Sequence, residues 1–334
     1  MTTLNWAIVG TGEIAHDFAA AIRQVNGRVF AVCSRQMDRS RQFASECGAE
    51  HAYDNIDEML RNSSIDIVYI ATPHSNHHSY VMKCLHADKH VFCEKAITVN
   101  SEELKEIQAV AAEKKLILAE AMTIYHMPLY GELHKIIDSG RLGALKMINV
   151  SMGDPKEYDP KNRFYNPELA GGALLDMGVY ALSFVRCFLS GPLDQILTSV
   201  QKAATGVDEQ SATILRTSRN EMANVSLSLN TSIPRIGTIG CEKGYIEIKE
   251  FSRADQAIIH YADGQTEMIQ SGSTDQALAY EVGYMNRCVQ GEQIERTMNL
   301  TTDVMELMTR IREKWDMRYP FEQKLASSEP EESM

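Results

Sequence analysis

A carboxylate and a phenol lie four residues apart in an apolar stretch, and a lysine ends an apolar strand elsewhere in the chain. The pair is Asp176 and Tyr180 in GGALLDMGVYAL, and the lysine is Lys95 in HVFCEKAITVN. Residues four apart share one helical face, and polar groups on an apolar helix need partners. A tyrosine, with a pKa near ~10, acts as an acid or base near neutrality only if a cation stabilises its phenolate. Lys95 is a candidate for that cation, and the three side chains would then surround a carbon that exchanges hydride. The structural alternatives are a satisfied Asp–Tyr pair and a solvated Glu94–Lys95 ion pair.

A glycine-rich turn, GTGEIA, follows the first apolar run of the chain. Gly10 permits a tight turn, Gly12 lets the backbone approach a pyrophosphate, and small Ala15 lets the next helix pack closely. The turn and the first helical residues, Glu13 and Ile14, therefore predict a dinucleotide site at a helix N-terminus. The alternative is an ordinary strand-to-helix turn.

The end of the second predicted strand bears on the choice of cofactor. NAD-binding proteins usually carry an acidic residue there, which binds the ribose 2′-hydroxyl. This chain has Ser34 and Arg35 in AVCSRQMDR. Serine removes the carboxylate that would repel a 2′-phosphate, and arginine can pair with one. We therefore expect NADP in preference to NAD; in the alternative, Arg35 is only an exposed loop charge.

The segment IATPHSNHHSY follows another apolar run and carries several polar groups. Thr72, Pro73 and His74 leave the strand where a nicotinamide ribose would lie, and we expect them to contact the cofactor. The later histidines of the segment are expected to begin the next helix. No carboxylate or cysteine shares the spacing of the histidines, so we predict no metal site.

The elements that must position these residues divide the chain into two parts. Residues 1–122 alternate short apolar strands with amphipathic helices, which predicts an α/β domain with a parallel sheet of the Rossmann type. Residues 123–325 contain several consecutive strands framed by helices, which predicts an α+β domain with an open, mostly antiparallel sheet. The polar, acidic residues 326–334 read as a disordered tail.

Composition narrows the classes of function. The chain has 334 residues, 44% of them hydrophobic, and a net charge of -12, which disfavours a nucleic-acid partner because phosphates need a basic face. Seven scattered cysteines without a CxxC pair suit a reducing cytoplasm. The chain begins directly with a strand-like run and has no continuous apolar run of about eighteen residues, so we expect neither a signal peptide nor a membrane span.

Taken together, several motifs resemble the Gfo/Idh/MocA oxidoreductase family: GTGEIA, IATPHSNHHSYVMKCLHADKHVFCEKAITVN, LAEAM, GRLGALKMI, GGALLDMGVYAL and GCEKGYIEI. Within the family, the form with Tyr180 is most similar to dimeric dihydrodiol dehydrogenases and their bacterial relatives. The resemblance implies hydride transfer between NAD(P) and a sugar, polyol or dihydrodiol carbon. It assigns catalysis to Lys95, Asp176 and Tyr180, places Glu94 beside the nicotinamide, and implies a homodimer or homotetramer formed through the C-terminal sheet.

This sequence departs from the family pattern at two places. The family usually reads E-K-P, with a peptide bond that is often cis, whereas this chain has Ala96 after the lysine; the Lys95–Ala96 bond is therefore either cis or trans. Dihydrodiol dehydrogenases also carry other residues where this chain has Tyr125 and His126, which either line a polar pocket or cap the next helix. Arg163 and Tyr165 either contact substrate hydroxyls or brace their loop. A non-catalytic NAD(P) sensor on the same scaffold is the alternative function.

Overall fold

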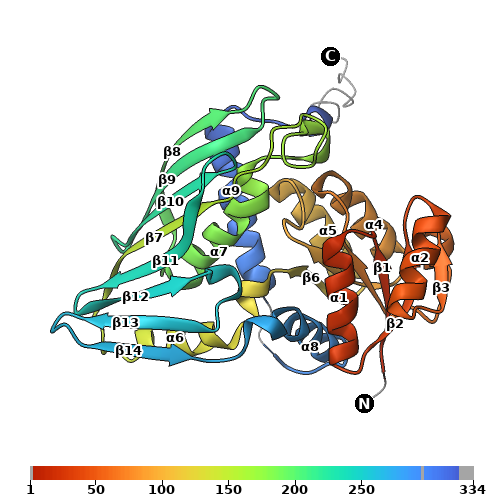
Figure 1. The fold of residues 1–334 in the computed structure, drawn as a ribbon, viewed down its shortest axis with the longest axis horizontal. Coiled ribbons are helices and arrows are strands. Elements are labelled where there is room, and N and C mark those ends of the chain that lie inside the picture. Colours follow the sequence, from red (N-terminus) through yellow and green to blue (C-terminus); the bar gives the residue numbers. More distant parts are fainter. Residues whose placement is uncertain (1–2, 295–296, 323–334) are drawn as a thin grey trace.

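Two β-sheets lie side by side in the protein, with helices packed between and around them (Figure 1). The computed structural model describes residues 3–294 and 297–322. The predicted tail, residues 326–334, lies outside the described residues. The order of elements matches an N-terminal α/β part followed by a part that is rich in consecutive strands.

The first sheet has six parallel strands in the order β3-β2-β1-β4-β5-β6. They are β1 (Asn5–Val9), β2 (Arg28–Cys33), β3 (His51–Tyr53), β4 (Ile67–Ile70), β5 (His90–Glu94) and β6 (Leu118–Ala121). The chain reverses direction across the sheet between β1 and β4. In such doubly wound sheets, ligands bind outside the carboxyl ends of the strands at this switch point.

The two faces of the sheet pack on two layers of helices, and residues along β1, β4 and β5 alternate between them. Trp6, Ile8, Val29 and Val32 pack on α1 (Glu13–Gln24) and α2 (Met37–Cys47), with a break in the alternation of β2 at a register shift beside β1. Ala7, Val9, Val68 and Val91 face α3 (Ile56–Leu60), α4 (His77–His86) and α5 (Ser101–Glu113). This period of two is why the strands read as continuous apolar runs: both faces of a parallel sheet are covered.

The second sheet has eight strands in the order β14-β13-β12-β11-β7-β10-β9-β8. They are β7 (Leu145–Gly153), β8 (Leu193–Lys202), β9 (Asp208–Thr217), β10 (Met222–Ser228), β11 (Ile233–Cys241), β12 (Gly244–Lys249), β13 (Gln256–Tyr261) and β14 (Thr266–Gln270). All neighbours are antiparallel except β7 and β10. The sheet is therefore open and mostly antiparallel, as the sequence predicts.

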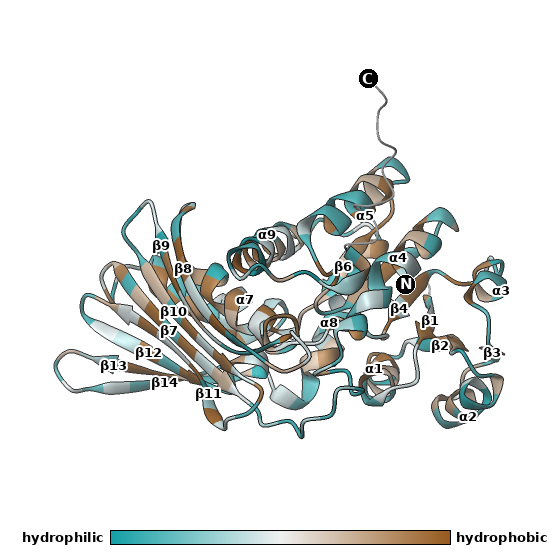
Figure 2. Ribbon diagram, turned by 90° about the horizontal axis from the view of Figure 1, so that it is seen from above, coloured by the Kyte–Doolittle hydropathy of each residue, from teal (hydrophilic) through white to brown (hydrophobic). Residues whose placement is uncertain are grey.

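In the described part of the chain, the helices that pack on this sheet cover the side that faces the first one (Figure 2). They are α6 (Pro128–Asp138), α7 (Val179–Phe188) and α9 (Met298–Lys314), and a π-helical turn, Leu174–Gly178, leads into α7. Apolar residues of α7 and α9 belong to the same buried cluster as one face of the first sheet. The two parts of the protein thus share a continuous core.

Some elements carry no clear sequence signal. The short β3, α3 and β14 have too few residues to show a period, and the sequence pattern of α8 (Ala277–Val289) does not reveal where that helix packs. Val282 and Met285 of α8 complete the layer formed by α1 and α2, and Asn286 accepts a hydrogen bond from the indole of Trp6 at 3.1 Å. The helix α8 therefore packs on the first sheet although it lies beyond residue 122 in the chain.

One buried helical stretch resembles a membrane span in length and composition. Within residues 3–294 and 297–322, Pro167–Phe188 is the only such stretch, and 78% of its most apolar window is buried inside the protein. A mostly buried core helix meets the same criteria, so the finding is weak evidence for a membrane.

Candidate active site

A cleft of about 1110 Å³ opens at the carboxyl ends of β1, β2, β4 and β5. All eleven residues that the sequence assigns to cofactor binding line it: Gly10, Gly12, Glu13, Ile14, Ser34, Arg35, Thr72, Pro73, His74, Glu94 and Lys95. Tyr180 and Arg163, from the second part of the chain, also line it. The cleft therefore joins the glycine-rich turn to the Tyr180 helix.

The glycine-rich turn has the shape that a pyrophosphate needs. Gly10 has φ +111°, and a Cβ there would meet the carbonyl oxygen of Ala71 at 2.2 Å. A Cβ on Gly12 would meet no heavy atom within 4 Å, so the space above this residue is open. The amides of α1 begin at the next residue, and helix N-termini favour anions. These residues fit a dinucleotide.

The far end of the cleft carries two arginines. Arg35 and Arg39 both line it, and neither forms an ion pair with another described residue. Ser34 contacts the start of α2: its hydroxyl donates to the carbonyl of Gln36 at 2.8 Å and accepts from Ser40 at 2.9 Å. With no carboxylate at position 34, this end of the cleft suits a phosphate.

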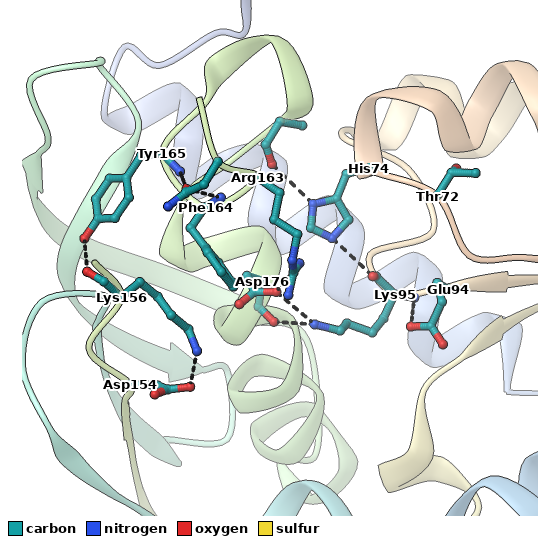
Figure 3. A network of polar contacts seen from close by, with 12 residues as sticks. Thr72, His74, Glu94, Lys95, Asp154, Lys156, Arg163, Phe164, Tyr165 and Asp176 are labelled. Atoms are coloured by element: carbon teal, nitrogen blue, oxygen red, sulfur yellow. Dashed lines mark hydrogen bonds and ion pairs between the residues drawn. The ribbon is translucent and has the colours of Figure 1, made fainter. Parts of the chain in front are cut away.

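Lys95 is the centre of a polar network at the other end of the cleft (Figure 3). Its Nζ donates to the backbone carbonyl of Asp176 at 2.7 Å and lies 3.3 Å from the Oδ1 of that residue. The same Nζ lies 4.7 Å from the centre of the Tyr180 ring. Arg163 binds the same Oδ1 at 3.1 Å. The structure therefore brings together all three predicted catalytic residues.

Burial and charge set the ionisation of this network. Burial alone would lower the pKa of Lys95, but Asp176, Tyr180 and Glu94 outweigh it and raise that pKa. Burial opposes ionisation of Asp176, yet Lys95 and Arg163 hold its pKa well below the usual value. Both groups are therefore charged at neutral pH. Burial also raises the pKa of Glu94, whose carboxylate accepts from the hydroxyl of Tyr69.

The phenol of Tyr180 is protonated at neutral pH. Burial raises its pKa, while the ammonium of Lys95 lowers it. The expected effect of Lys95 is thus present, but burial outweighs it in the protein alone. A phenol that holds its proton beside a cation is suited to donating that proton to an oxygen that gains negative charge.

Comparison with known proteins identifies the scaffold. A family profile described as "Oxidoreductase family, NAD-binding Rossmann fold" matches residues 4–122, and one described as "GFO/IDH/MocA C-terminal domain" matches residues 130–247. The chain belongs to the Gfo/Idh/MocA oxidoreductase family. It is therefore an NAD(P)-binding oxidoreductase, as the resemblance of its motifs implies.

The relatives of this Gfo/Idh/MocA protein include enzymes that act on CH–OH groups. Trans-1,2-dihydrobenzene-1,2-diol dehydrogenase of Xenopus laevis is 29% identical over 95% of this chain and 99% of its own length. The human enzyme of that name is 30% identical over 73% of this chain and 74% of its own.

Solved structures share the fold at lower sequence identity. The 3-ketoreductase KijD10 of Actinomadura kijaniata, in complex with NADP and TDP-benzene, has a TM-score of 0.85 at 21% identity, covering 93% of this chain and 98% of that one. UDP-N-acetylglucosamine 3-dehydrogenase of Acidithiobacillus ferrooxidans has a TM-score of 0.79 at 18% identity, covering 93% and 97%.

The family motif E-K-P is altered here, and the structure shows the backbone at that point. The Lys95–Ala96 peptide bond is cis. Two buried imidazoles lie against the carbonyls of its two residues: His74 Nε2 lies 3.2 Å from the Lys95 oxygen, and His77 Nδ1 lies 2.8 Å from the Ala96 oxygen. Burial lowers the pKa of His74 to about 3, so this ring is neutral and has one N–H to donate, either to the Lys95 carbonyl or to that of Ala170. His74 thus packs against the backbone of Lys95 as well as lining the cleft.

The sequence interpretation needs two corrections at the site. Asp176 does not line the cleft with Lys95 and Tyr180; it lies behind Lys95, because its carboxylate is held by that ammonium and by Arg163. Tyr125 and His126 lie away from the cleft. The Tyr125 hydroxyl is 2.9 Å from the hydroxyl of Ser183. The His126 ring packs on Tyr284, with ring centres 4.4 Å apart.

One residue of the site, Arg39, was not assigned from the sequence; it lies in α2, four residues after Arg35, which precedes that helix. For Arg163 the sequence left open a contact with substrate hydroxyls or a bracing role in its loop. The structure places it at the cleft and bound to Asp176, a contact that no periodic pattern signals. Tyr165, by contrast, braces its loop: it is buried and near the carbonyl of Lys156 at 3.4 Å. Within the described residues, no group of three or more potential ligands could hold a metal.

Proposed function

We propose that the protein is an NADP-preferring oxidoreductase that interconverts a secondary alcohol and a carbonyl of a sugar, polyol or dihydrodiol-like substrate. The observation that carries this proposal is the position of the Lys95 ammonium, between Asp176 and the ring of Tyr180 at one end of a dinucleotide-shaped cleft. The relatives support the substrate class: their names describe a dihydrodiol and nucleotide-linked compounds.

The residues of the site act on the oxygen of the reacting carbon. A bound nicotinamide supplies the hydride in reduction and accepts it in oxidation. Tyr180 donates its phenol proton to the carbonyl oxygen during reduction, and takes the hydroxyl proton during oxidation. Lys95 stabilises negative charge on that oxygen and on the phenolate, because its ammonium is fixed beside the ring. Asp176 orients the ammonium and offsets the cost of burying it.

The preference for NADP rests on the far end of the cleft. Arg35 and Arg39 both line it, and Ser34 presents a hydroxyl in place of the carboxylate that NAD-binding chains carry there. Two guanidinium groups can pair with a 2′-phosphate through charge-assisted hydrogen bonds. We expect NADPH to bind more tightly than NADH.

A screen of purified protein tests the proposal. NADPH and NADH oxidation are followed by absorbance with a panel of keto sugars and diketones, and NADP reduction is followed with polyols and dihydrodiols. Turnover with at least one substrate, faster with NADPH than with NADH, is the expected result. The alternative, a non-catalytic NAD(P) sensor, is indicated by tight nucleotide binding without turnover of any compound in the panel.

The open face of the eight-stranded sheet supports a homo-oligomer. Exposed apolar side chains stand on it, at Met147, Leu197, Ile214 and Tyr245, and Leu197 pairs directly with Ile214 across β8 and β9. Exposed apolar patches mark interaction surfaces. We expect a homodimer or homotetramer built through this face. Light scattering should give a monomer mass for Leu197→Arg, and a monomeric wild type would refute the assembly.

We also infer a reducing compartment, the cytoplasm, for this protein. None of the seven cysteines forms a disulfide in the structure, and five of them are buried. Buried cysteines without disulfides suit a compartment in which disulfides do not persist. Fractionation of cells that express the protein tests this location.

A further inference from the structure

A buried carboxylate contacts the turn that opens the helix carrying Asp176 and Tyr180. Asp208, the first residue of β9, is fully buried and accepts a hydrogen bond from the amide of Leu174 at 2.6 Å. Its other oxygen, Oδ1, is buried without a hydrogen-bond partner in the described residues. This carboxyl group has no role in the proton transfer described above, although it contacts the first turn of the helix that carries Tyr180.

The turn is shaped around this carboxyl group. Gly172 has φ +124°, and a Cβ there would meet the Oδ1 of Asp208 at 2.0 Å. Any larger residue would displace either the carboxylate or the helix. The glycine pair that the sequence shows before the helix is therefore explained in part: Gly172 leaves room for Asp208.

Two other side chains lie against the neighbouring carbonyls of the same turn. The hydroxyl of Tyr319 donates to the Gly171 carbonyl at 2.8 Å, and His74 Nδ1 lies 3.2 Å from the Ala170 carbonyl. Among these contacts, Asp208 is the one that reaches an amide within the helix itself. Asp208 thus joins the open sheet to the first turn of the helix.

The position of this first turn matters directly to Lys95. The Lys95 ammonium donates to the backbone carbonyl of Asp176, two residues after Leu174. A shift of the helix backbone therefore moves the acceptor of Lys95 as well as the ring of Tyr180. Displacements of about 1 Å in a catalytic group can cost roughly 10²-fold in rate.

We propose that Asp208 is a positioning residue: it fixes the first turn of the helix so that Asp176 and Tyr180 meet Lys95. This inference rests on the proposed catalytic function. Asp208 itself does not line the cleft and does not touch the reacting atoms. Burial raises the pKa of its carboxyl to about 7, although the hydrogen bond from the amide of Leu174 favours the charged form and lowers the pKa.

The test compares Asp208→Ala, Asp208→Asn and a control, Asp194→Asn, which removes a charge from an exposed Asp–Arg pair on the same sheet. Asp208→Ala should lower kcat roughly 10–10²-fold, with the KM for NADPH within about 2-fold of wild type. Asp208→Asn should recover kcat to within about 3-fold, because the amide oxygen still accepts from Leu174. The control should match wild type.

Hydrogen exchange gives a readout that needs no substrate. Amides at residues 174–178 should exchange faster in Asp208→Ala than in wild type or Asp208→Asn, while β10 and β11 stay unchanged. If Asp208→Ala does not fold, Asp208→Leu carries the test, because leucine has a similar shape but cannot accept from Leu174; unchanged exchange at 174–178 in it would overturn the proposal. Unchanged exchange and kcat in Asp208→Ala would do the same. Absence of turnover in the wild type would instead refute the catalytic function and leave the exchange result as the test of positioning.

Discussion

Replacing Lys95 with methionine removes the cation beside Tyr180 while keeping an unbranched side chain of similar length. The Nζ lies 4.7 Å from the ring centre, so at an effective dielectric constant near 20 the interaction with a phenolate is worth about 3.5 kcal/mol. That energy corresponds to about 2.5 pKa units. Burial already raises the pKa of Tyr180, and the ammonium of Lys95 lowers it. Loss of the ammonium therefore raises this pKa further.

The assay is the pH profile of alcohol oxidation, in which Tyr180 acts as the base. Below the pKa the rate follows the phenolate fraction, so the variant should be slower by roughly 10²–10³-fold at each pH, with a parallel rise toward high pH. A primary deuterium isotope effect confirms that hydride transfer is measured. Lys83→Met is the matched control, because Lys83 lines the same cleft but pairs with Asp57. A loss below about 10-fold in Lys95→Met, or an equal loss in the control, refutes the reasoning.

Three further perturbations test other parts of the structure. Gly10→Ala should destabilise the protein, because its Cβ would meet the Ala71 carbonyl. Gly12→Ala should keep the wild-type melting temperature but lose NADPH affinity in a fluorescence titration, because the space above Gly12 is open. The reverse pattern would contradict the turn geometry. Ser34→Asp should lower kcat/KM for NADPH at least about 10-fold and spare NADH, and an unchanged ratio would argue against a 2′-phosphate site. Burial raises the pKa of the Glu120 carboxyl to about 7, so the folded state binds this proton more tightly than the unfolded state. The free energy of unfolding should therefore fall by about 3 kcal/mol as pH rises from ~4.5 to ~7. In urea unfolding, Glu120→Gln should lack this dependence on pH.

Much of the fold follows from patterns in the sequence. Strands buried on both faces, such as Ile67–Ile70, appear in the sequence as apolar runs, and the helices between them show a helical period of apolar residues. The parallel sheet was therefore predictable. The open antiparallel sheet was predictable as well, because its strands follow one another in the sequence. Short elements such as His51–Tyr53 carry too few residues for a period. The packing of Ala277–Val289 on the first sheet is a tertiary contact across most of the chain, which local patterns do not report.

The site was predictable where a motif encodes its geometry. Gly10 and Gly12 specify a turn, and the spacing of Asp176 and Tyr180 specifies a shared helical face. Contacts made through irregular backbone were not predictable. Arg163 reaches Asp176 from a loop, and Asp208 reaches Leu174 from the start of a strand. Neither position carries a periodic signal, and the depth of burial that raises the pKa of Tyr180 depends on the whole packed structure.

The central claim is that Tyr180 transfers the proton that accompanies hydride transfer. Single-turnover reduction of a carbonyl substrate by NADPH, in wild type and Tyr180→Phe, tests it most directly. The phenylalanine variant keeps the ring beside Lys95 but lacks the hydroxyl. The predicted result is a loss of about 10²–10⁴-fold in the rate of NADPH oxidation, with the Kd for NADPH within about 2-fold of wild type. Oxidation of NADPH at the wild-type rate, or an equal loss of cofactor affinity, would contradict the claim.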